Sequence, residues 1–140
     1  IGKEVALYED NIVTNGKKPG NQNTVNYYKR NTDGTWPTTE TVTQQLLPGG
    51  ADDNATSKFG NALAIDASSI AVGAPGVDSN KGAVFIYEIS GNEYVEKAKL
   101  QGSDLESPVD EFTGSKMGTD IVLKNSNLLE GELSIITFIV

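Results

Sequence analysis

The sequence predicts an all-β protein built from repeated units of four strands, and two observations carry this prediction. Its apolar runs are short and rich in Val, Ile, Thr and Tyr, with Gly and Pro between them, as in chains of many short strands. The run 95–100, the best helix candidate, is too short to form one. Gly2, Gly60 and Gly118 recur at intervals of 58 residues, which indicates an internal repeat.

The repeat extends beyond the glycines. Ile1, Phe59 and Met117 each precede one of them. The same 58-residue offset also superposes the apolar positions that follow, in three sets: Val5, Leu63 and Ile121; Leu7, Ile65 and Leu123; Ile12, Ile70 and Leu128. Three copies in register indicate three structural units, of which the third is partial.

The middle copy begins with a predicted hairpin. An alternating run at 62–65 is followed by the polar stretch 66–69 and a second run at 70–73, which is the pattern of two strands joined by a tight turn. The corresponding turns of the first and third copies are predicted at 8–11 and 124–127, where the residues also favour turns.

Two further strands are predicted in each complete copy. The run 82–87 matches 24–28 at an offset of 59, so the preceding loop differs by one residue. A glycine turn then leads into a fourth strand. Residues 31–36 align with 90–94 in the repeat, so that Trp36 is matched with Tyr94. We expect both aromatic rings to be packing residues and not a sugar-stacking platform. Units of four strands are typical of propeller blades, including kelch blades.

The middle copy carries a specific sequence signature. It has Phe59-Gly60, then Gly73-Ala74-Pro75 within 72–76, then the strand at 82–87. This order resembles the FG-GAP repeat of integrin α subunits and of many extracellular algal and bacterial proteins. The first copy has Asn15-Gly16-Lys17 in place of Gly-Ala-Pro, so we expect an irregular second strand or following loop. The third has Glu130-Gly131-Glu132 there.

The resemblance implies a β-propeller, which in this family typically has seven blades. The chain is then a fragment with about two and a half repeats, at 1–58, 59–116 and 117–140. Phe59 is expected to fill space between blades, and Gly60 to permit a bend or a close contact. Gly73, Ala74 and Pro75 are expected to end a central strand, because Pro75 cannot extend the ladder.

The composition excludes several functional classes. The chain has a formal net charge of −8 with dispersed Lys and Arg, which argues against nucleic-acid binding. It contains no His or Cys, so His-based triads and thiol chemistry are absent. No apolar run is long enough to span a membrane. An acidic surface suits cations, basic partners or solubility.

These observations and the resemblance predict a non-catalytic extracellular or cell-surface segment for adhesion, protein interaction or ligand binding. Its partners would be a protein, a glycan or further blades of the same protein. Two alternatives are an accessory domain of a larger secreted enzyme and a structural repeat of a surface filament or coat. Fold does not choose among these.

Calcium is a cofactor that the resemblance suggests and the residues oppose. Integrin-type blades often bind Ca²⁺ in their first hairpin through an Asp-rich loop with a glycine. The middle copy has only Asp66-Ala67-Ser68-Ser69 at that place. We therefore expect neither a metal site nor any other cofactor.

Candidate ligand-binding residues are the acidic side chains of the loops that would share one propeller face. Glu106 belongs to the same acidic stretch as the last members of the set. The candidates are Asp52, Asp53, Asp78, Asp104, Asp110 and Glu111. Asn54-Ala55-Thr56 is a candidate glycosylation triplet. The apolar, β-prone tail 133–140 would be a hazardous free edge, so we expect additional chain or another protomer to cover it.

Overall fold

The computed structural model describes residues 3–20, 23–38, 41–101, 117–125 and 133–135. These residues form two four-stranded antiparallel sheets, a two-stranded sheet and almost no helix. The prediction of an all-β chain with four-stranded units is confirmed.

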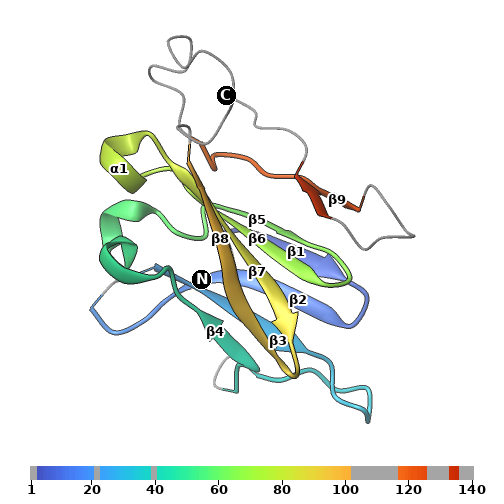
Figure 1. Cartoon of the computed structure of the whole chain (residues 1–140). Coiled ribbons are helices and arrows are strands. Elements are labelled where there is room, and N and C mark those ends of the chain that lie inside the picture. Colours follow the sequence, from blue (N-terminus) through green and yellow to red (C-terminus); the bar gives the residue numbers. More distant parts are fainter. Residues whose placement is uncertain (1–2, 21–22, 39–40, 102–116, 126–132, 136–140) are drawn as a thin grey trace.

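Each large sheet is a meander in which strands adjacent in sequence are hydrogen-bonded neighbours. The first sheet contains β1 (Val5–Tyr8), β2 (Asn11–Lys17), β3 (Asn23–Lys29) and β4 (Gln44–Leu46). The second contains β5 (Ala62–Ile65), β6 (Ser69–Ala74), β7 (Ala83–Ser90) and β8 (Glu93–Gln101). The two sheets overlap in Figure 1, where β5 is close to β1 and β2.

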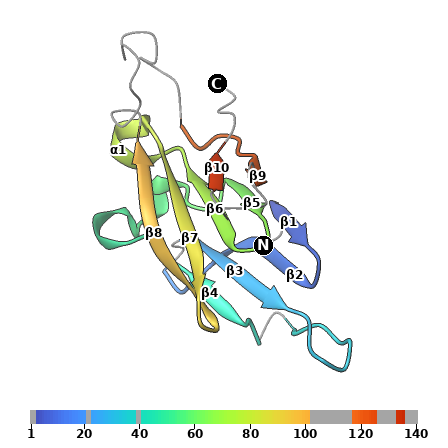
Figure 2. The same cartoon turned by 45° about the vertical axis from the view of Figure 1, so that its right-hand side comes forward.

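Short elements connect and follow these sheets. Two 3₁₀ turns, η1 (Gly50–Asp52) and η2 (Ala55–Ser57), lie between them, and the single turn α1 (Val77–Asn80) lies between β6 and β7. The strands β9 (Leu123–Asn125) and β10 (Leu133–Ile135) form the two-stranded sheet. Figure 2 shows it on the side of β5 and β6.

The strand pairing repeats along the chain. Leu7 pairs with Ile12 in the first sheet, and Ile65 pairs with Ile70, 58 residues later, in the second. The pair Val13 and Tyr27 becomes Ala71 and Ile86. The second and third strands are therefore offset by 58 and 59 residues, which confirms the one-residue difference in the loop.

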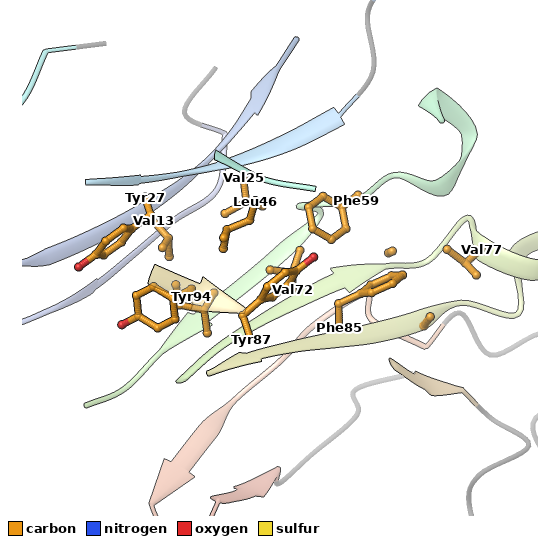
Figure 3. Packing of buried hydrophobic residues seen from close by; sticks show 13 residues of the cluster. Val13, Val25, Tyr27, Leu46, Phe59, Val72, Val77, Phe85, Tyr87 and Tyr94 are labelled. Carbon is orange, nitrogen blue, oxygen red and sulfur yellow. The ribbon is translucent and has the colours of Figure 1, made fainter. Parts of the chain in front are cut away.

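The two sheets pack face to face around one apolar cluster, drawn in Figure 3. Val13, Val25 and Leu46 from the first sheet are fully or almost fully buried against Val72 and Phe85 from the second. Facing apolar side chains from two sheets supply most of the stabilisation of such a core.

Phe59 lies between the two sheets, with only 2% of its surface exposed. Its ring packs edge to face against Phe85 at a centroid distance of 5.4 Å and against Tyr87 at 6.3 Å. Val25 and Leu46 lie on the other side of the ring in Figure 3. Phe59 therefore joins the cores of the two units.

Gly60 and Gly118 make equivalent close contacts 58 residues apart. Both have positive φ, +84° and +85°, a conformation that favours glycine. A Cβ on Gly60 would come within 3.3 Å of the carbonyl oxygen of Thr24, and one on Gly118 would clash with the carbonyl oxygen of Ala83. Thr24 and Ala83 are themselves equivalent, so each unit begins against the third strand of the one before it.

The turn predicted at Asp33-Gly34 is found, but the fourth strand predicted to follow it, with Trp36 aligned to Tyr94, is wrong. The fourth strand of the first sheet is β4, and 31–36 is part of a connection. Asp33 Oδ1 accepts hydrogen bonds from the backbone and the hydroxyl of Thr35, and such local bonds compete with a sheet ladder. Trp36 is 40% exposed whereas Tyr94 is 5% exposed in β8, so these rings are not equivalent and Trp36 is not a core packing residue.

An irregular second strand at Asn15-Gly16-Lys17 is not found. β2 pairs with β3 without a break as far as Lys17. Gly16 permits this because a Cβ there would come 2.7 Å from Asn26 Nδ2. The missing side chain leaves room for the cross-strand amide.

The turn predicted at 124–127 is wrong over its first two residues. Lys124 and Asn125 belong to β9 and pair with Ser134 and Leu133. The β-prone run near the end of the chain supplies the partner strand, β10. Residues 136–140 lie outside the described part, and coverage of the tail stays a prediction.

Candidate functional site

Three segments meet at one end of the two sheets, and we call them the loop edge: residues 18–20, 47–61 and 75–82. Gly76 N donates to Ser57 O at 2.9 Å, which joins the loop after β6 to the connection between the sheets. Lys18, after β2, reaches Asp53. Figure 1 shows α1 beside the two 3₁₀ turns. The edge is thus one surface formed by segments distant in sequence.

The candidate ligand residues Asp52 and Asp53 lie on this edge in ion pairs. Asp52 contacts Lys99 Nζ of β8 at 2.6 Å, and Asp53 contacts Lys18 Nζ at 2.6 Å. All four side chains are largely buried, with 19–30% exposed. Partly exposed pairs contribute about 1 kcal/mol or less each. They attach the connection to both sheets, and their role in ligand binding stays a prediction.

Asp78 is the most exposed described member of the candidate set. Its side chain is 53% exposed and pairs with Lys81 at 3.3 Å. β6 ends at Ala74, as expected before Pro75. Asp78, Ser79 and Asn80, later in the same loop, have positive φ between 48° and 70°, so the loop turns there in the left-handed sense. The remaining candidates, Asp104, Asp110 and Glu111, and Glu106 with them, lie outside the described residues.

Asn54, the glycosylation candidate, caps η2. Its Oδ1 accepts from the backbone nitrogens of Thr56 and Ser57 at 2.9 and 3.0 Å. Its Nδ2, the atom that a glycan would modify, donates to Ala51 O at 2.7 Å. The triplet therefore has a structural role as a helix cap, and its modification stays a prediction.

A shallow surface hollow opens on the loop edge where the second unit begins. It is lined by Ala55, Phe59 and Gly60 and by four polar residues, which we call its rim: Asn15, Asn23, Lys58 and Asn61. Asn15 and Asn23 come from β2 and β3, whereas Lys58 and Asn61 flank the Phe-Gly pair. The hollow thus lies at the junction of the two units, a place that sequence reasoning did not indicate.

The opposite end of the sheets, which carries the β-hairpin turns and residues 30–43, is called the hairpin end. There Asp66 Oδ1 accepts from the backbone nitrogens of Ser68 and Ser69 at 3.0 and 2.9 Å. Its Oδ2 is buried without a hydrogen-bond partner in the described part of the chain. Among the described residues no three acidic, His or Cys side chains gather around a metal position. The expected lack of calcium stays a prediction.

Two tyrosines from the two sheets meet near the hairpin end. The rings of Tyr27 and Tyr94 pack edge to face at 4.9 Å, and the Tyr27 hydroxyl donates to Asn11 Oδ1 at 2.7 Å. Burial raises the pKa of Tyr94 to about 12, and the charges of Tyr27 and Asp66 act in the same direction. Both groups are therefore neutral packing residues at physiological pH.

Gln44 joins the two outer strands in a way that the sequence did not reveal. Its Nε2 donates to Tyr94 O at 2.7 Å, and its Oε1 accepts from Tyr94 N at 2.8 Å. The side-chain amide of β4 thus pairs with the backbone of β8 as another strand would. The Tyr87 hydroxyl adds a second link by donating to Leu47 O at 2.7 Å.

Comparisons with known proteins identify the middle of the chain. No helix within the described residues is long and apolar enough to cross a membrane. No curated protein matches the chain. A family model described as the FG-GAP repeat matches residues 41–87, a segment that runs from just before β4 into β7 and includes Phe59-Gly60 and Gly73-Ala74-Pro75. The chain therefore carries an FG-GAP repeat, and its two four-stranded sheets fit part of a β-propeller.

Proposed function

We propose that this chain is a non-catalytic interaction segment of an extracellular or cell-surface protein, and that it binds a protein or glycan ligand through the loop edge. The observation that carries the proposal is the construction of that edge. Segments from both units are fixed there by ion pairs, a helix cap and backbone hydrogen bonds. Binding residues are commonly found on loops that a rigid scaffold positions.

Other features support the remaining parts of the proposal. FG-GAP repeats suggest propeller-type interaction modules and are typical of extracellular proteins. Asp52 and Asp53 each pair with a lysine, whereas acid and base catalysis by carboxylates requires two of them to face a substrate. Adhesion and ligand binding therefore fit the chemistry of this edge better than catalysis does.

Beads coated with the chain test the use of the loop edge. We expect them to bind the surface of intact cells that produce the protein, and Asp78→Asn to reduce binding several-fold. Asparagine tolerates the positive φ of position 78, so this variant changes charge without straining the loop. Glu93→Gln makes the same charge change at the hairpin end and should leave binding unchanged. Equal binding by both variants, or equal loss, would contradict the proposal.

Antibody labelling tests the location. An antibody raised against this chain should label cells that produce the protein before their membranes are permeabilised. Labelling that appears only after permeabilisation would exclude an extracellular or cell-surface role.

A further inference from the structure

We propose that the hollow beside Phe59-Gly60 binds a carboxylate group of the ligand. The inference rests on the proposed function, because the hollow lies on the loop edge. The carboxylate would come from an acidic side chain of a protein or from an acidic sugar. In either case the group bound in the hollow is an anion, whereas the acidic composition of the rest of the chain favours cations or basic groups.

The amide of Asn15 has a fixed orientation at the rim. Its Oδ1 accepts hydrogen bonds from the backbone nitrogens of Lys3 and Glu4 at 3.1 and 3.3 Å. Because backbone nitrogens only donate, the oxygen must face them and Nδ2 is the other arm of the amide. Asn15 therefore offers two N–H donors, and the described residues give that nitrogen no acceptor.

The other two amides each keep one donor for a ligand. Asn23 Nδ2 donates to Ala55 O at 3.2 Å, and Asn61 Nδ2 donates to Thr119 O at 3.2 Å. A primary amide has two N–H groups, so one remains on each side chain. The rim thus has four amide N–H groups without a described acceptor, beside the Oδ1 atoms of Asn23 and Asn61, and a carboxylate can accept from these N–H groups.

Lys58 supplies the charge. Its residue is exposed and its ammonium makes no ion pair with any described carboxylate. The acidic residues of the adjoining connection, Asp52 and Asp53, are paired with Lys99 and Lys18. Neither of them is the partner of Lys58 among the described ion pairs.

The net charge of −8 does not oppose this local preference. At physiological ionic strength the Debye length is about 8 Å, so distant carboxylates are largely screened. A carboxylate in the hollow would mainly experience Lys58 and the amide donors. Charge-assisted hydrogen bonds of this kind are stronger than neutral ones.

The second junction differs from the first at the position of Asn15. Asn15 corresponds to Gly73 in the second unit, where no side chain projects and Gly118 lies directly against the backbone. The space that Asn15 borders in the first unit is therefore closed by close contact in the second. The side chain of Asn15 is therefore a feature of the first junction and not of the 58-residue repeat.

An NMR titration of the ¹⁵N-labelled chain tests the proposal. The probes are a short acetylated, amidated peptide with one Asp, glucuronate, the same peptide with Asn, and glucose. We expect saturable shifts of the Gly60 and Asn61 amides and of the Asn side-chain signals with at least one acidic probe. The dissociation constant should be on the order of 1 mM, as for a small ligand with a single charged contact.

Matched variants show whether Lys58 is responsible. Lys58→Gln should weaken binding at least five-fold, and Asn61→Asp, which adds a negative charge at the rim, should abolish it. Lys97→Gln removes an exposed lysine of β8 and should change nothing. The amide spectrum of each variant shows that it is folded. No saturable shift, equal shifts with the neutral probes, or unchanged binding by Lys58→Gln would overturn the proposal.

The probes also distinguish the sources of the carboxylate and separate this inference from the proposed function. Tighter binding of the Asp peptide supports a protein ligand, and tighter binding of glucuronate supports an acidic glycan. Cell binding that depends on Asp78 but not on Lys58, without any carboxylate binding, would remove this inference alone. Carboxylate binding without cell binding would remove the proposed function and leave the site.

Discussion

The two four-stranded units share one strand register but differ in the chemistry of equivalent faces. Val72 and Phe85 of the second sheet are buried against the first sheet. Their equivalents, Thr14 and Asn26, lie on the opposite face of the first sheet from Val13, and Gln45 Nε2 donates to Asn26 Oδ1 at 3.1 Å. The strand register shared by the two sheets is therefore set by the turns and by the alternation of side chains along each strand. It does not depend on what each face of the sheet contacts.

The units differ also at their third connection. In the second unit β7 and β8 are joined by a tight turn at Gly91 and Asn92, whereas residues 30–43 join β3 and β4 in the first. The first unit thus carries an exposed aromatic loop with Trp36 that has no counterpart in the second.

The largest effect is expected at the aromatic ring between the units. Phe59→Ala should lower the free energy of unfolding by about 3–5 kcal/mol, as expected for a fully buried aromatic residue. Trp36→Ala, at a half-exposed position of the first unit, should cost about 0.5 kcal/mol or less. Urea denaturation of both variants measures the difference, and similar costs would contradict the placement of Phe59.

Placing asparagine at position 73, the equivalent of Asn15, tests how closely the second and third units approach. Gly73→Asn places a side chain against the backbone of Gly118 and should cost about 1–3 kcal/mol. Gly91→Asn is the matched control, because its φ of +66° suits Asn and no atom lies within 4 Å of the added Cβ. A Gly73→Asn variant as stable as the control would show that the third unit does not pack there.

The link between the outer strands should have a smaller effect. Gln44→Ala removes two hydrogen bonds to the Tyr94 backbone and should cost about 1–2 kcal/mol. Gln45→Ala is the control, since Gln45 is exposed and bonds only within its own sheet. Thermal unfolding of the two variants compares their stabilities. A larger loss of stability for Gln45→Ala would contradict the conclusion that Gln44 joins the two sheets.

The smallest effect is expected for the ion pairs of the loop edge. Asp53→Asn should cost about 1 kcal/mol at low ionic strength and much less in 1 M NaCl, because salt screens the pair. Asp10→Asn breaks the exposed pair with Arg30 at the hairpin end and should have almost no effect. Chemical denaturation at two salt concentrations measures both, and no salt dependence for Asp53→Asn would contradict the pairing with Lys18.

Features fixed by local patterns could be predicted from the sequence. The strand at 62–65 was placed at its observed bounds, because alternating residues before a polar turn are enough to define a hairpin strand. The one-residue difference between the offsets also followed from alignment alone. In contrast, the strand expected directly after the Asp33-Gly34 turn was misplaced, because the fourth strand is β4, at Gln44–Leu46.

Contacts between distant residues could not be predicted. Asp52 and Lys99 are 47 residues apart in the sequence. The clustering of acidic residues in the sequence does not show that Asp52 is paired with a lysine. The hollow was invisible for the same reason, since Asn15 and Lys58 meet only when the second unit packs on the first. The sequence thus identified the edge where function is proposed but not the sign of its available charge.

The most direct test of the repeated packing is a set of proton–proton nuclear Overhauser effects between units. We expect contacts between Gly60 Hα and a Val25 methyl group, and between Gly118 Hα and Gly73 Hα, because these atoms lie at the two equivalent junctions. Observation of both contacts in the free chain would support face-to-face packing in a 58-residue register. Complete absence of both, with the strand pairing within each sheet intact, would contradict it.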